Sequence, residues 1–350
     1  MAATHPDKKG GAAVISAFIA DVAYYLPSGS VTNDDLSRAF PEWSVDKISA
    51  KTGIEVRHIA GPDEFTSDLA TGAARALASA GRVDLNEVDY LIVCTQSPDY
   101  FLPTTACMVH ENLGLRSDAG AIDINLGCSG YVYGMGLAKG LIESGQVRNV
   151  LLITADTYSK FLNPEDKSVR TIFGDAASAT FVSSRESSGA DISALVYGSD
   201  GSGAKHLMVP RGGLRPGADL THDAEPEARG LQPSSYDLYM NGPEIFNFTL
   251  RVVPETFAAV LAKAEISEDE VDLVVVHQAN AFMLEHLRKK LAVPTEKFFV
   301  HIANCGNTVS STIPIALAEA AESGVLRRGM NVLVMGFGVG LSWGGFMLRW

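Results

Sequence analysis

The stretch that decides the fold is Asp123-Ile124-Asn125-Leu126-Gly127-Cys128-Ser129-Gly130-Tyr131. Apolar and polar side chains alternate from 121 to 125, which predicts a short buried strand. Gly127 permits a sharp turn, and a helix is expected from Cys128 to about Gly145. The first turn of a helix offers unpaired N–H groups and the positive end of its dipole, so we expect the Cys128 thiol to ionise readily and act as a nucleophile. The alternative is a buried thiol that only packs as a small hydrophobic side chain.

The composition is that of a large folded protein. The chain has 350 residues, of which 46% are hydrophobic, and its formal net charge is −13. Nucleic acid attracts a basic face, so this charge argues against nucleic acid as a partner. No apolar run reaches the roughly 20 residues that span a membrane, and the first ten residues lack the apolar core of a signal peptide. We therefore expect a cytoplasmic protein with no membrane partner.

The spacing of cysteines and histidines indicates neither a metal site nor a disulfide framework. The four cysteines form no CxxC pair, and the eight histidines show no HExxH spacing. The glycines between 336 and 340 lack the GxGxxG spacing of a dinucleotide-binding loop. We expect no metal, and we interpret this glycine segment as a backbone turn.

Strand-like and helix-like segments alternate, which predicts an α/β fold with a mainly parallel sheet. Strands are expected at 14–23, 89–94, 121–125 and 149–155, and helices at 67–80, 104–113 and after Cys128. The last helix contains glycines 130, 134, 136 and 140, each of which costs about 1 kcal/mol relative to alanine. We therefore expect this helix to be central, with another helix packed closely against its glycines.

The second half of the chain repeats the first about 180 residues later. Three segments recur in order: 88–96 as 271–278, 148–152 as 330–334, and 15–17 as 192–194. The repeat predicts two similar halves, 13–185 and 190–350, whose corresponding strands end at one central site. Residues 1–12 are expected to form a disordered tail. The stretch 198–227, rich in glycine, proline and charge, is expected to be a surface excursion.

Two polar residues follow predicted strands of the second half. His277 comes directly after the buried run 273–276, where α/β sheets usually bind ligands. Asn307 lies in a polar turn after a strand expected at 297–302. A histidine satisfied within the core and an asparagine that caps a helix are the alternatives. Together with the thiol, the two residues predict acyl transfer through a covalent intermediate, with hydrogen-bond donors for developing negative charge.

These residues resemble the β-ketoacyl-acyl carrier protein synthase III family. The resemblance is carried by Cys128 in its strand–turn–helix, His277 in His-Gln-Ala-Asn and Asn307 in Gly-Asn-Thr. Further matching motifs are Ser311 with Ile313-Pro314, Lys51-Thr52-Gly53-Ile54, Pro103-Thr104-Thr105-Ala106-Cys107, Phe173-Gly174-Asp175-Ala176 and the ending 337–344. The resemblance implies the thiolase-like fold, with duplicated βαβαβ halves in an α-β-α-β-α arrangement, and usually a homodimer.

The resemblance also implies roles. Cys128 would take an acyl group from a coenzyme A thioester, and the N–H groups of Cys128 and Val339 would form its oxyanion hole. His277 and Asn307 would bind the thioester carbonyl of malonyl-acyl carrier protein and favour its decarboxylation. The enolate would then attack the acyl-cysteine to give a 3-oxoacyl-carrier protein, with no metal or redox cofactor.

The chain departs from the family pattern around its substrates. Leu102 replaces an aromatic residue that closes the acyl pocket across the dimer, so longer or branched acyl groups are expected to fit. Trp43 and Lys51 resemble residues that contact the coenzyme A nucleotide, and Asn280 is assigned to the substrate site. An arginine that steers the carrier protein is replaced by Phe282. The nearby basic residues Arg288, Lys289 and Lys290 are predicted to serve instead, the alternative being an ordinary solvated helix face.

Three other functions remain open at this stage. The acyl-cysteine could pass its acyl group to a hydroxyl or amine, with His277 as general base. The chain could also be a catalytically silent subunit of a heterodimer, although its three catalytic residues are intact. A thiolase or HMG-CoA synthase would use other acid–base groups. Fatty-acid initiation and specialised biosynthesis are both compatible with the sequence.

Overall fold

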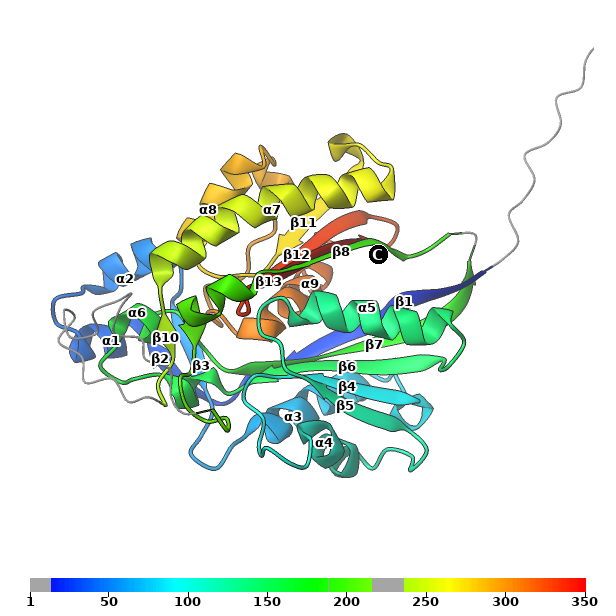
Figure 1. The fold of residues 1–350 in the computed structure, drawn as a ribbon, viewed down its shortest axis with the longest axis horizontal. Coiled ribbons are helices and arrows are strands. Elements are labelled where there is room, and N and C mark those ends of the chain that lie inside the picture. The colour runs from blue at the N-terminus through cyan, green and yellow to red at the C-terminus, as the bar shows by residue number, and fades with distance from the viewer. Residues whose placement is uncertain (1–13, 188, 216–235) are drawn as a thin grey trace, which may run out of the picture.

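Two sheets lie on either side of a pair of central helices in the computed structural model (Figure 1). It describes residues 14–187, 189–215 and 236–350, so the predicted tail 1–12 and part of the predicted excursion 198–227 lie outside the described residues. Within 198–215, the chain forms a 3-10 helix, η3 (Gly201–His206), and a short strand, β9 (Leu207–Met208). Leu207 is buried, so this part of the excursion contributes to the interior.

The first sheet has the strand order β1-β7-β6-β4-β5. Its strands are β1 (Val14–Tyr25), β4 (Tyr90–Cys94), β5 (Gly120–Ile124), β6 (Asn149–Asp156) and β7 (Ala176–Ser187). β4 pairs in parallel with β5 and β6, whereas β7 runs antiparallel to β6 and β1. β5 is half-buried because it forms the edge of the sheet, so the expectation of a buried strand before Cys128 was wrong.

The second sheet has the order β11-β12-β13-β8. Its strands are β8 (Ile192–Ser199), β11 (Leu273–Val276), β12 (Asn331–Gly338) and β13 (Ser342–Arg349). The repeated sequence segments form equivalent strands, since β4 and β6 are parallel neighbours in one sheet, as β11 and β12 are in the other. The strand expected at 297–302 was wrong: only an isolated bridge joins Phe298 to Val274.

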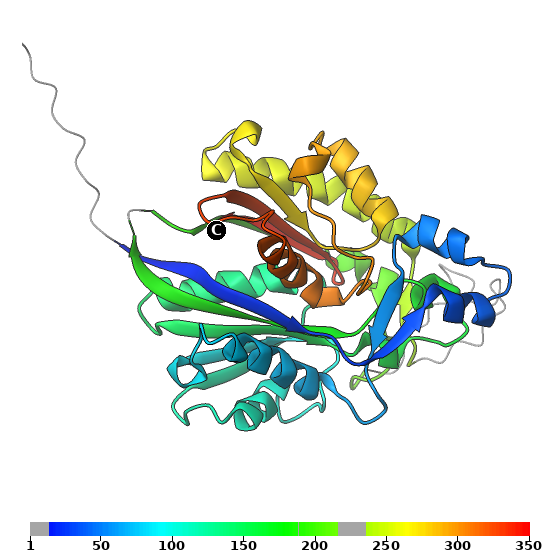
Figure 2. The same cartoon turned by 180° about the vertical axis from the view of Figure 1, so that it is seen from behind.

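Helices complete an α-β-α-β-α arrangement (Figures 1 and 2), which confirms the predicted layering. α3 (Thr66–Ser79) and α4 (Thr105–Leu113) cover the outer face of the first sheet. α7 (Gly242–Ala264) and α8 (Ala281–Lys290) cover that of the second. α5 (Gly130–Glu143) and α9 (Thr312–Glu322) lie between the sheets and share one apolar cluster with strands of both. This burial on both sides places α5 at the centre of the molecule.

The glycines of α5 face strands rather than another helix. An added Cβ at Gly130 would lie 2.2 Å from the Cys94 sulfur of β4, and one at Gly134 would lie 2.6 Å from Leu152 of β6. At Gly136 it would lie 1.8 Å from the Tyr197 hydroxyl of β8. The prediction of a central helix is confirmed, but the close approach that its glycines permit is to the two sheets.

α7 is the one described helix that has the length and apolar composition of a membrane span. The expectation that no segment would reach this length was therefore wrong. One face of α7 is buried against β8, β12 and β13, and it contributes Phe248, Val252 and Val260 to the cluster beneath it. Its apolar character is explained by this packing on the second sheet.

Smaller elements gather at one end of the layers, on the left in Figure 1. They are β2 (Gly29–Thr32), β3 (Val56–Ile59), α1 (Asn33–Ala39), α2 (Val45–Thr52), α6 (Lys167–Arg170) and β10 (Tyr239–Met240). β2 pairs with β3, and β10 pairs with β9. This end faces the carboxyl ends of β4, β6 and β11, where the predicted site residues are expected.

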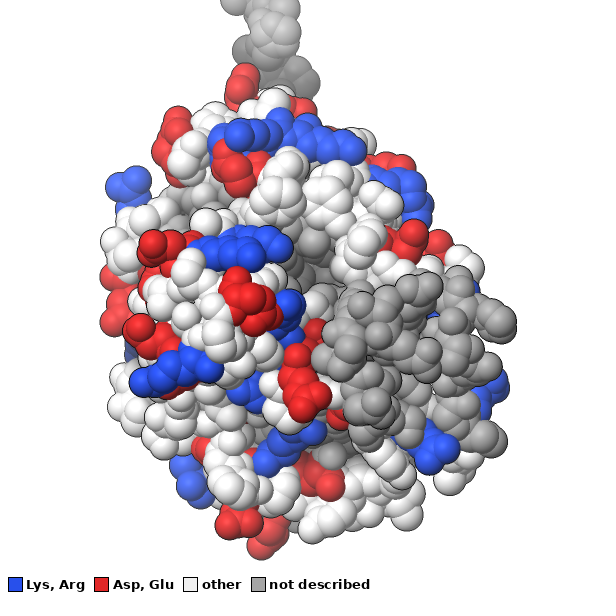
Figure 3. Space-filling view, turned by 90° about the vertical axis from the view of Figure 1, so that its left-hand side faces the viewer, with Lys and Arg blue, Asp and Glu red and all other residues white. Residues whose placement is uncertain are grey.

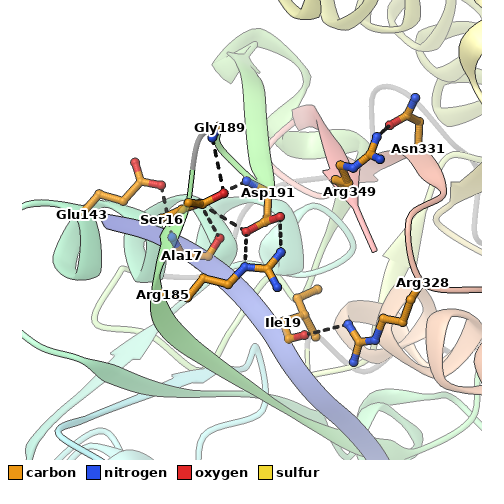
Figure 4. A network of polar contacts seen from close by, with 11 residues as sticks. Ser16, Ala17, Ile19, Glu143, Arg185, Gly189, Asp191, Arg328, Asn331 and Arg349 are labelled. Atoms are coloured by element: carbon orange, nitrogen blue, oxygen red, sulfur yellow. Dashed lines mark hydrogen bonds and ion pairs between the residues drawn. The ribbon is translucent and has the colours of Figure 1, made fainter. Parts of the chain in front are cut away.

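A polar network joins the two sheets at the opposite end (Figure 4). Asp191, just before β8, donates its backbone N–H to the Ser16 hydroxyl of β1, at 3.1 Å. Arg185 of β7 makes a bidentate ion pair with the Asp191 carboxylate. Arg328 donates to the Ile19 carbonyl of β1, at 3.3 Å. The network connects β1 of the first sheet to the start of β8 in the second.

Candidate active site

Cys128, His277 and Asn307 line one cavity of about 190 Å³. Cys128 lies in the turn between β5 and α5, His277 follows β11, and Asn307 precedes η7 (Val309–Ser311). The remaining lining is mainly apolar and comes from Ile172, Phe173, Leu207, Met240, Gly242, Ile245, Phe246, Ala279, Asn280, Met283, Phe337 and Gly338. The structure therefore brings together the three residues that the sequence analysis selected.

Cys128 is a buried thiol that precedes its helix. α5 begins at Gly130 with Ser129 as its N-cap, so Cys128 lies just outside the first turn. Its side chain is 5% exposed. Burial raises the pKa of the Cys128 thiol far above its usual range, and the nearby Asp156 carboxylate raises the pKa further. The expectation of a readily ionised thiol was wrong for the free protein, because desolvation outweighs the advantage of a helix start.

The backbone of β12 forms the wall behind Cys128. An added Cβ at Gly338 would lie 3.1 Å from the Cys128 sulfur and 2.8 Å from its Cβ. One at Gly336 would lie 2.8 Å from the Cys128 carbonyl oxygen. Both contacts are closer than ordinary van der Waals distances, so glycine is required at these positions for the strand to pass Cys128.

His277 is buried and neutral. Burial lowers its pKa to about 3, so the imidazole carries no charge at physiological pH. Its Nδ1 lies 2.7 Å from the Thr312 hydroxyl. The Phe337 ring packs edge-on against the imidazole, with 5.4 Å between the two ring centres. Thr312 fixes the ring orientation and leaves Nε2 for the cavity.

Asn307 is held through its backbone and through its side-chain oxygen. Its N–H donates to the Ile172 carbonyl, and its carbonyl accepts from Gly174, both at 3.0 Å. Its Oδ1 accepts from the Val309 N–H at 3.0 Å. The Asn307 Nδ2 donates no hydrogen bond to any described residue, so two N–H donors are available to a ligand in the cavity.

Trp43 and Lys51 lie together on the surface, at the end of the molecule that contains α1 and α2. The ammonium groups of Lys47, Lys51 and Lys167 lie 5.2, 4.7 and 5.7 Å from the centre of the Trp43 ring. Asn280 lines the cavity and caps α8, where its Oδ1 accepts from the Met283 N–H at 2.9 Å. The Asn280 oxygen is thus occupied by the helix.

The residues predicted for the acyl end and for the carrier protein lie outside the cavity. Leu102 is 84% exposed and does not line it. On α8, Arg288 and Lys289 both pair with Glu285, and Lys290 donates to the Leu250 carbonyl at 2.7 Å. The predicted basic cluster is therefore partly neutralised by its own helix.

Sequence reasoning missed three groups around the cavity. Thr312 contacts His277 from 35 residues away, and Asp156 lies close enough to Cys128 to raise the pKa of its thiol. Phe246, near the start of α7, supplies apolar lining. Asp156 could have been selected from the sequence, because it is the polar residue at the end of a buried strand that belongs to the repeat.

Comparison with known proteins decides the family. A model of 3-oxoacyl-[acyl-carrier-protein] synthase III matches residues 122–201, and a model of the C-terminal part of that protein matches residues 261–350. The β-ketoacyl-[acyl-carrier-protein] synthase III of Caldanaerobacter subterraneus subsp. tengcongensis is 36% identical over 336 residues, which cover 96% of this chain and 98% of the relative. The chain belongs to the 3-oxoacyl-[acyl-carrier-protein] synthase III family.

Other members of the synthase III family agree with this assignment. The Clostridium perfringens β-ketoacyl-[acyl-carrier-protein] synthase III is 39% identical, over 93% of this chain and 96% of the relative. A crystal structure of a 3-oxoacyl-(acyl-carrier-protein) synthase III is 49% identical and superposes with a TM-score of 0.92, covering 96% of this chain and all of the other. The predicted thiolase-like synthase III fold is confirmed.

The pKa of Cys128 predicts how its reaction with iodoacetamide depends on pH. Because burial keeps the thiol protonated, the alkylation rate is expected to rise about tenfold per pH unit from 7 to 9, without a plateau. Peptide-level mass spectrometry separates Cys128 from the exposed Cys107. A plateau below pH 7 would show a thiolate in the free protein and contradict the role assigned to burial.

Proposed function

We propose that this protein condenses an acyl group from coenzyme A with malonyl-acyl carrier protein and forms a 3-oxoacyl-acyl carrier protein. The observation that carries the proposal is the shared cavity, in which a thiol faces a neutral imidazole and an unpaired amide N–H₂. The synthase III relatives bear the names of this activity. Thioester exchange and decarboxylation need no metal or redox cofactor, so we propose that none takes part.

In the first half-reaction, the Cys128 sulfur attacks the carbonyl carbon of the acyl-coenzyme A thioester. The bond to the coenzyme A sulfur breaks, and the Cys128 proton leaves with the coenzyme A thiol. The backbone N–H groups of Cys128 and Val339 are the proposed donors to the oxyanion. Gly338, which lines the cavity, supports this assignment because Val339 is its neighbour. The valine side chain does not prevent its amide from donating.

In the second half-reaction, His277 and Asn307 donate to the thioester carbonyl of malonyl-carrier protein. The carbon–carbon bond to the carboxylate breaks, carbon dioxide leaves, and the enolate attacks the acyl-cysteine. The bond to the Cys128 sulfur then breaks, and the thiolate that leaves takes a proton from water to restore the thiol. The donors stabilise the enolate oxygen, an effect worth about 3–4 kcal/mol per donor in comparable sites.

Thr312 can set the tautomer that this role needs. Its one hydroxyl hydrogen has two possible acceptors, the His277 Nδ1 at 2.7 Å and the Val309 carbonyl at 3.2 Å. The proposed role requires the Thr312 hydroxyl to donate to Nδ1, so that Nε2 carries the hydrogen. The His277 Nε2–H is thereby a donor toward the cavity. A Thr312 hydroxyl that donates to the Val309 carbonyl would instead go with Nδ1–H as the donor to Thr312.

Acyl transfer to a hydroxyl or amine is not favoured. That reaction needs His277 as a general base, and an imidazole whose pKa is lowered to about 3 removes protons poorly at neutral pH. A neutral imidazole does serve as a hydrogen-bond donor. The condensing reaction thus uses His277 in the state that burial imposes.

We place the coenzyme A nucleotide at Trp43. An adenine ring can stack on the indole, and the ammonium groups of Lys47, Lys51 and Lys167 supply charge for its phosphates. Asn280, at the cavity, is the proposed contact for the part of the substrate nearer the thioester.

We propose that the protein is cytoplasmic, because coenzyme A thioesters and reduced cysteines are both typical of the cytoplasm. Cell fractionation tests that location.

The carrier protein is proposed to approach along α8. On the face in Figure 3, basic and acidic side chains of the described residues alternate, so the described part of this face has no wide basic surface for an acidic partner. Lys289 has 69% of its side chain exposed, against 20% for Arg288, so it is the more accessible of these two cations. Arg288 and Lys290 support it from the same helix.

A homodimer is proposed across β5. This strand forms the free edge of the first sheet, and beside it lies an apolar cavity of about 530 Å³ lined by Ile124, Leu126, Tyr133, Leu137 and Tyr197 among others. Leu137 is 48% exposed and Leu102 is 84% exposed. A second copy that pairs with β5 would cover these side chains. Leu102 would then reach the partner's acyl pocket.

Intact-protein mass spectrometry tests the two half-reactions. Incubation with acyl-coenzyme A donors from acetyl to octanoyl is expected to add one acyl group, and Cys128→Ala is expected to remain unmodified. Malonyl-carrier protein should then remove the adduct and release carbon dioxide. Retention of the adduct would exclude condensation, and strict selectivity for acetyl would contradict the open pocket inferred from Leu102.

Charge reversal at Lys289 tests the docking of the carrier protein. Lys289→Glu is expected to raise the KM for malonyl-carrier protein about fivefold and to leave the KM for acyl-coenzyme A within twofold. The matched control is Lys263→Glu at the far end of α7, where the exposed Lys263 donates to the Leu195 carbonyl. Equal effects of the two variants would place the docking surface elsewhere.

Light scattering tests the oligomeric state. The expected mass is twice that of the 37.2 kDa chain. Leu137→Asp buries a charge in the proposed interface and is expected to shift the protein toward monomers, whereas Val325→Asp, at a 40% exposed site away from β5, is expected to leave the mass unchanged. A monomeric wild-type protein would contradict the proposed homodimer.

A further inference from the structure

Asp156 is a buried carboxylate to which the proposed half-reactions assign no role. It ends β6, its side chain is fully buried, and no described lysine or arginine pairs with it. A buried carboxylate costs free energy unless hydrogen bonds compensate for the lost water. Its partners therefore indicate what it does.

The Asp156 carboxylate connects the ends of two distant segments. Its Oδ1 accepts from the Gln96 N–H at 2.8 Å, just after β4. Its Oδ2 accepts from the Ser310 hydroxyl in a short hydrogen bond and from the Ser310 N–H at 3.4 Å. Ser310 is fully buried and belongs to η7, three residues after Asn307. One side chain of the first sheet thus holds the turn that carries a catalytic residue of the second.

The segment 307–312 needs such support. Val309 adopts a left-handed backbone with φ of 55°, a region that β-branched residues rarely occupy. Its N–H is bonded to the Asn307 Oδ1, so the conformation of Val309 sets where the Asn307 amide points. Thr312, at the end of the segment, contacts His277. A shift of this turn would move both proposed donors.

A second residue of β6 assists from the same strand. The Ser311 hydroxyl donates to the Thr154 carbonyl at 3.0 Å, and the two hydroxyl groups lie 2.9 Å apart. Ser310 and Ser311 are thus both bonded to the carboxyl end of β6. Only Asp156 brings a group that can carry a charge to this contact.

We propose that Asp156 is a positioning residue, which fixes the 307–312 turn through Ser310 so that Asn307 and His277 donate to the same carbonyl oxygen. The inference rests on the proposed role of Asn307. It assigns the hydrogen bonds between Asp156 and Ser310 to the condensing step. Transfer of the acyl group onto Cys128 uses other donors, and Asp156 bears on that step only through its effect on the pKa of the thiol.

Burial also places the pKa of Asp156 near neutral pH, in a range where neither Cys128 nor His277 changes its charge. Desolvation, with a smaller contribution from Asp175, raises its pKa to about 7, while the bonds from Ser310 and Gln96 oppose the shift. The other titratable groups near it are Cys94, Cys128 and Tyr158, whose pKa values burial raises far above neutrality. Ionised Asp156 is the better acceptor for both Ser310 donors, so condensation is expected to quicken as pH rises through about 7. The contribution of Asp156 to stability moves the other way: from about pH 4 to 7 its carboxyl is more protonated in the native protein than in the unfolded chain, so this contribution falls as pH rises. Buried His277 contributes with the opposite sign, because its native imidazole is neutral where the unfolded one is protonated.

Ser310→Ala tests the proposal, with Ser183→Ala as the matched control. Ser183 also donates its hydroxyl to a neighbouring side chain, Asn149, at 2.6 Å, but lies away from the cavity. In single turnovers, Ser310→Ala is expected to acylate Cys128 within twofold of wild type and to slow clearance of the adduct by malonyl-carrier protein about tenfold. Ser183→Ala is expected to change neither rate. Clearance within twofold of wild type for Ser310→Ala, or equal slowing of both steps with a lowered Tm, would overturn the proposal.

Two further variants separate this inference from the proposed function. Asn307→Ala is expected to slow clearance, and adding Ser310→Ala to it is expected to slow clearance by less than Ser310→Ala does alone, because only the His277 donor is then left for the turn to position. Normal clearance in Asn307→Ala would remove the proposed role of Asn307, whereas slow clearance there with normal clearance in Ser310→Ala would remove only the inference. Asp156→Asn is expected to abolish the rise in clearance rate near pH 7; a retained rise would assign it to another group and overturn the role of Asp156.

Discussion

Removal of water from the catalytic groups is the constraint on which this site depends. The thiol, the imidazole and the Asp156 carboxylate are buried where the two sheets meet, and burial favours the uncharged form of each. Uncharged donors in a dry cavity suit a reaction whose negative charge develops on a carbonyl oxygen. Such donors are already oriented, so they need little reorganisation when that charge appears.

The layered fold creates this environment by bringing the ends of corresponding strands together. Cys128 follows β5 of the first sheet and His277 follows β11 of the second, whereas Asn307 lies in the turn before η7. α5 fits between the sheets because its glycines allow strand side chains to approach its backbone. The contact between Asp156 and Ser310 joins the halves at the site itself, and the Ser16–Asp191–Arg185 network joins them at the far end.

Much of the fold could be predicted because local sequence patterns that are typical of strands and helices recur in the two halves of the chain. The repeated strands indicated two related sheets. A glycine turn between a strand and a helix indicated Cys128, and a polar residue directly after a buried strand indicated His277. The errors arose for properties that depend on contacts between residues far apart in the sequence. The pKa of Cys128 depends on burial and on Asp156, 28 residues away, and Trp43 meets Lys167 across more than a hundred residues. The glycines of α5 predicted a close neighbour, but the sequence does not say whether that neighbour is a helix or a strand.

The glycine wall behind Cys128 also limits how this protein can escape inhibition. A covalent inhibitor of the thiol would be bounded on that side by the backbone of β12, and a side chain at Gly338 would collide with the nucleophile itself. Because Cys128 is the proposed nucleophile, a change that reshapes this wall is expected to abolish acyl transfer as well as inhibitor binding. Compounds that rely on the glycine side for their fit are therefore expected to be harder to evade than compounds that rely on side chains of the lining, such as Phe246 and Met283.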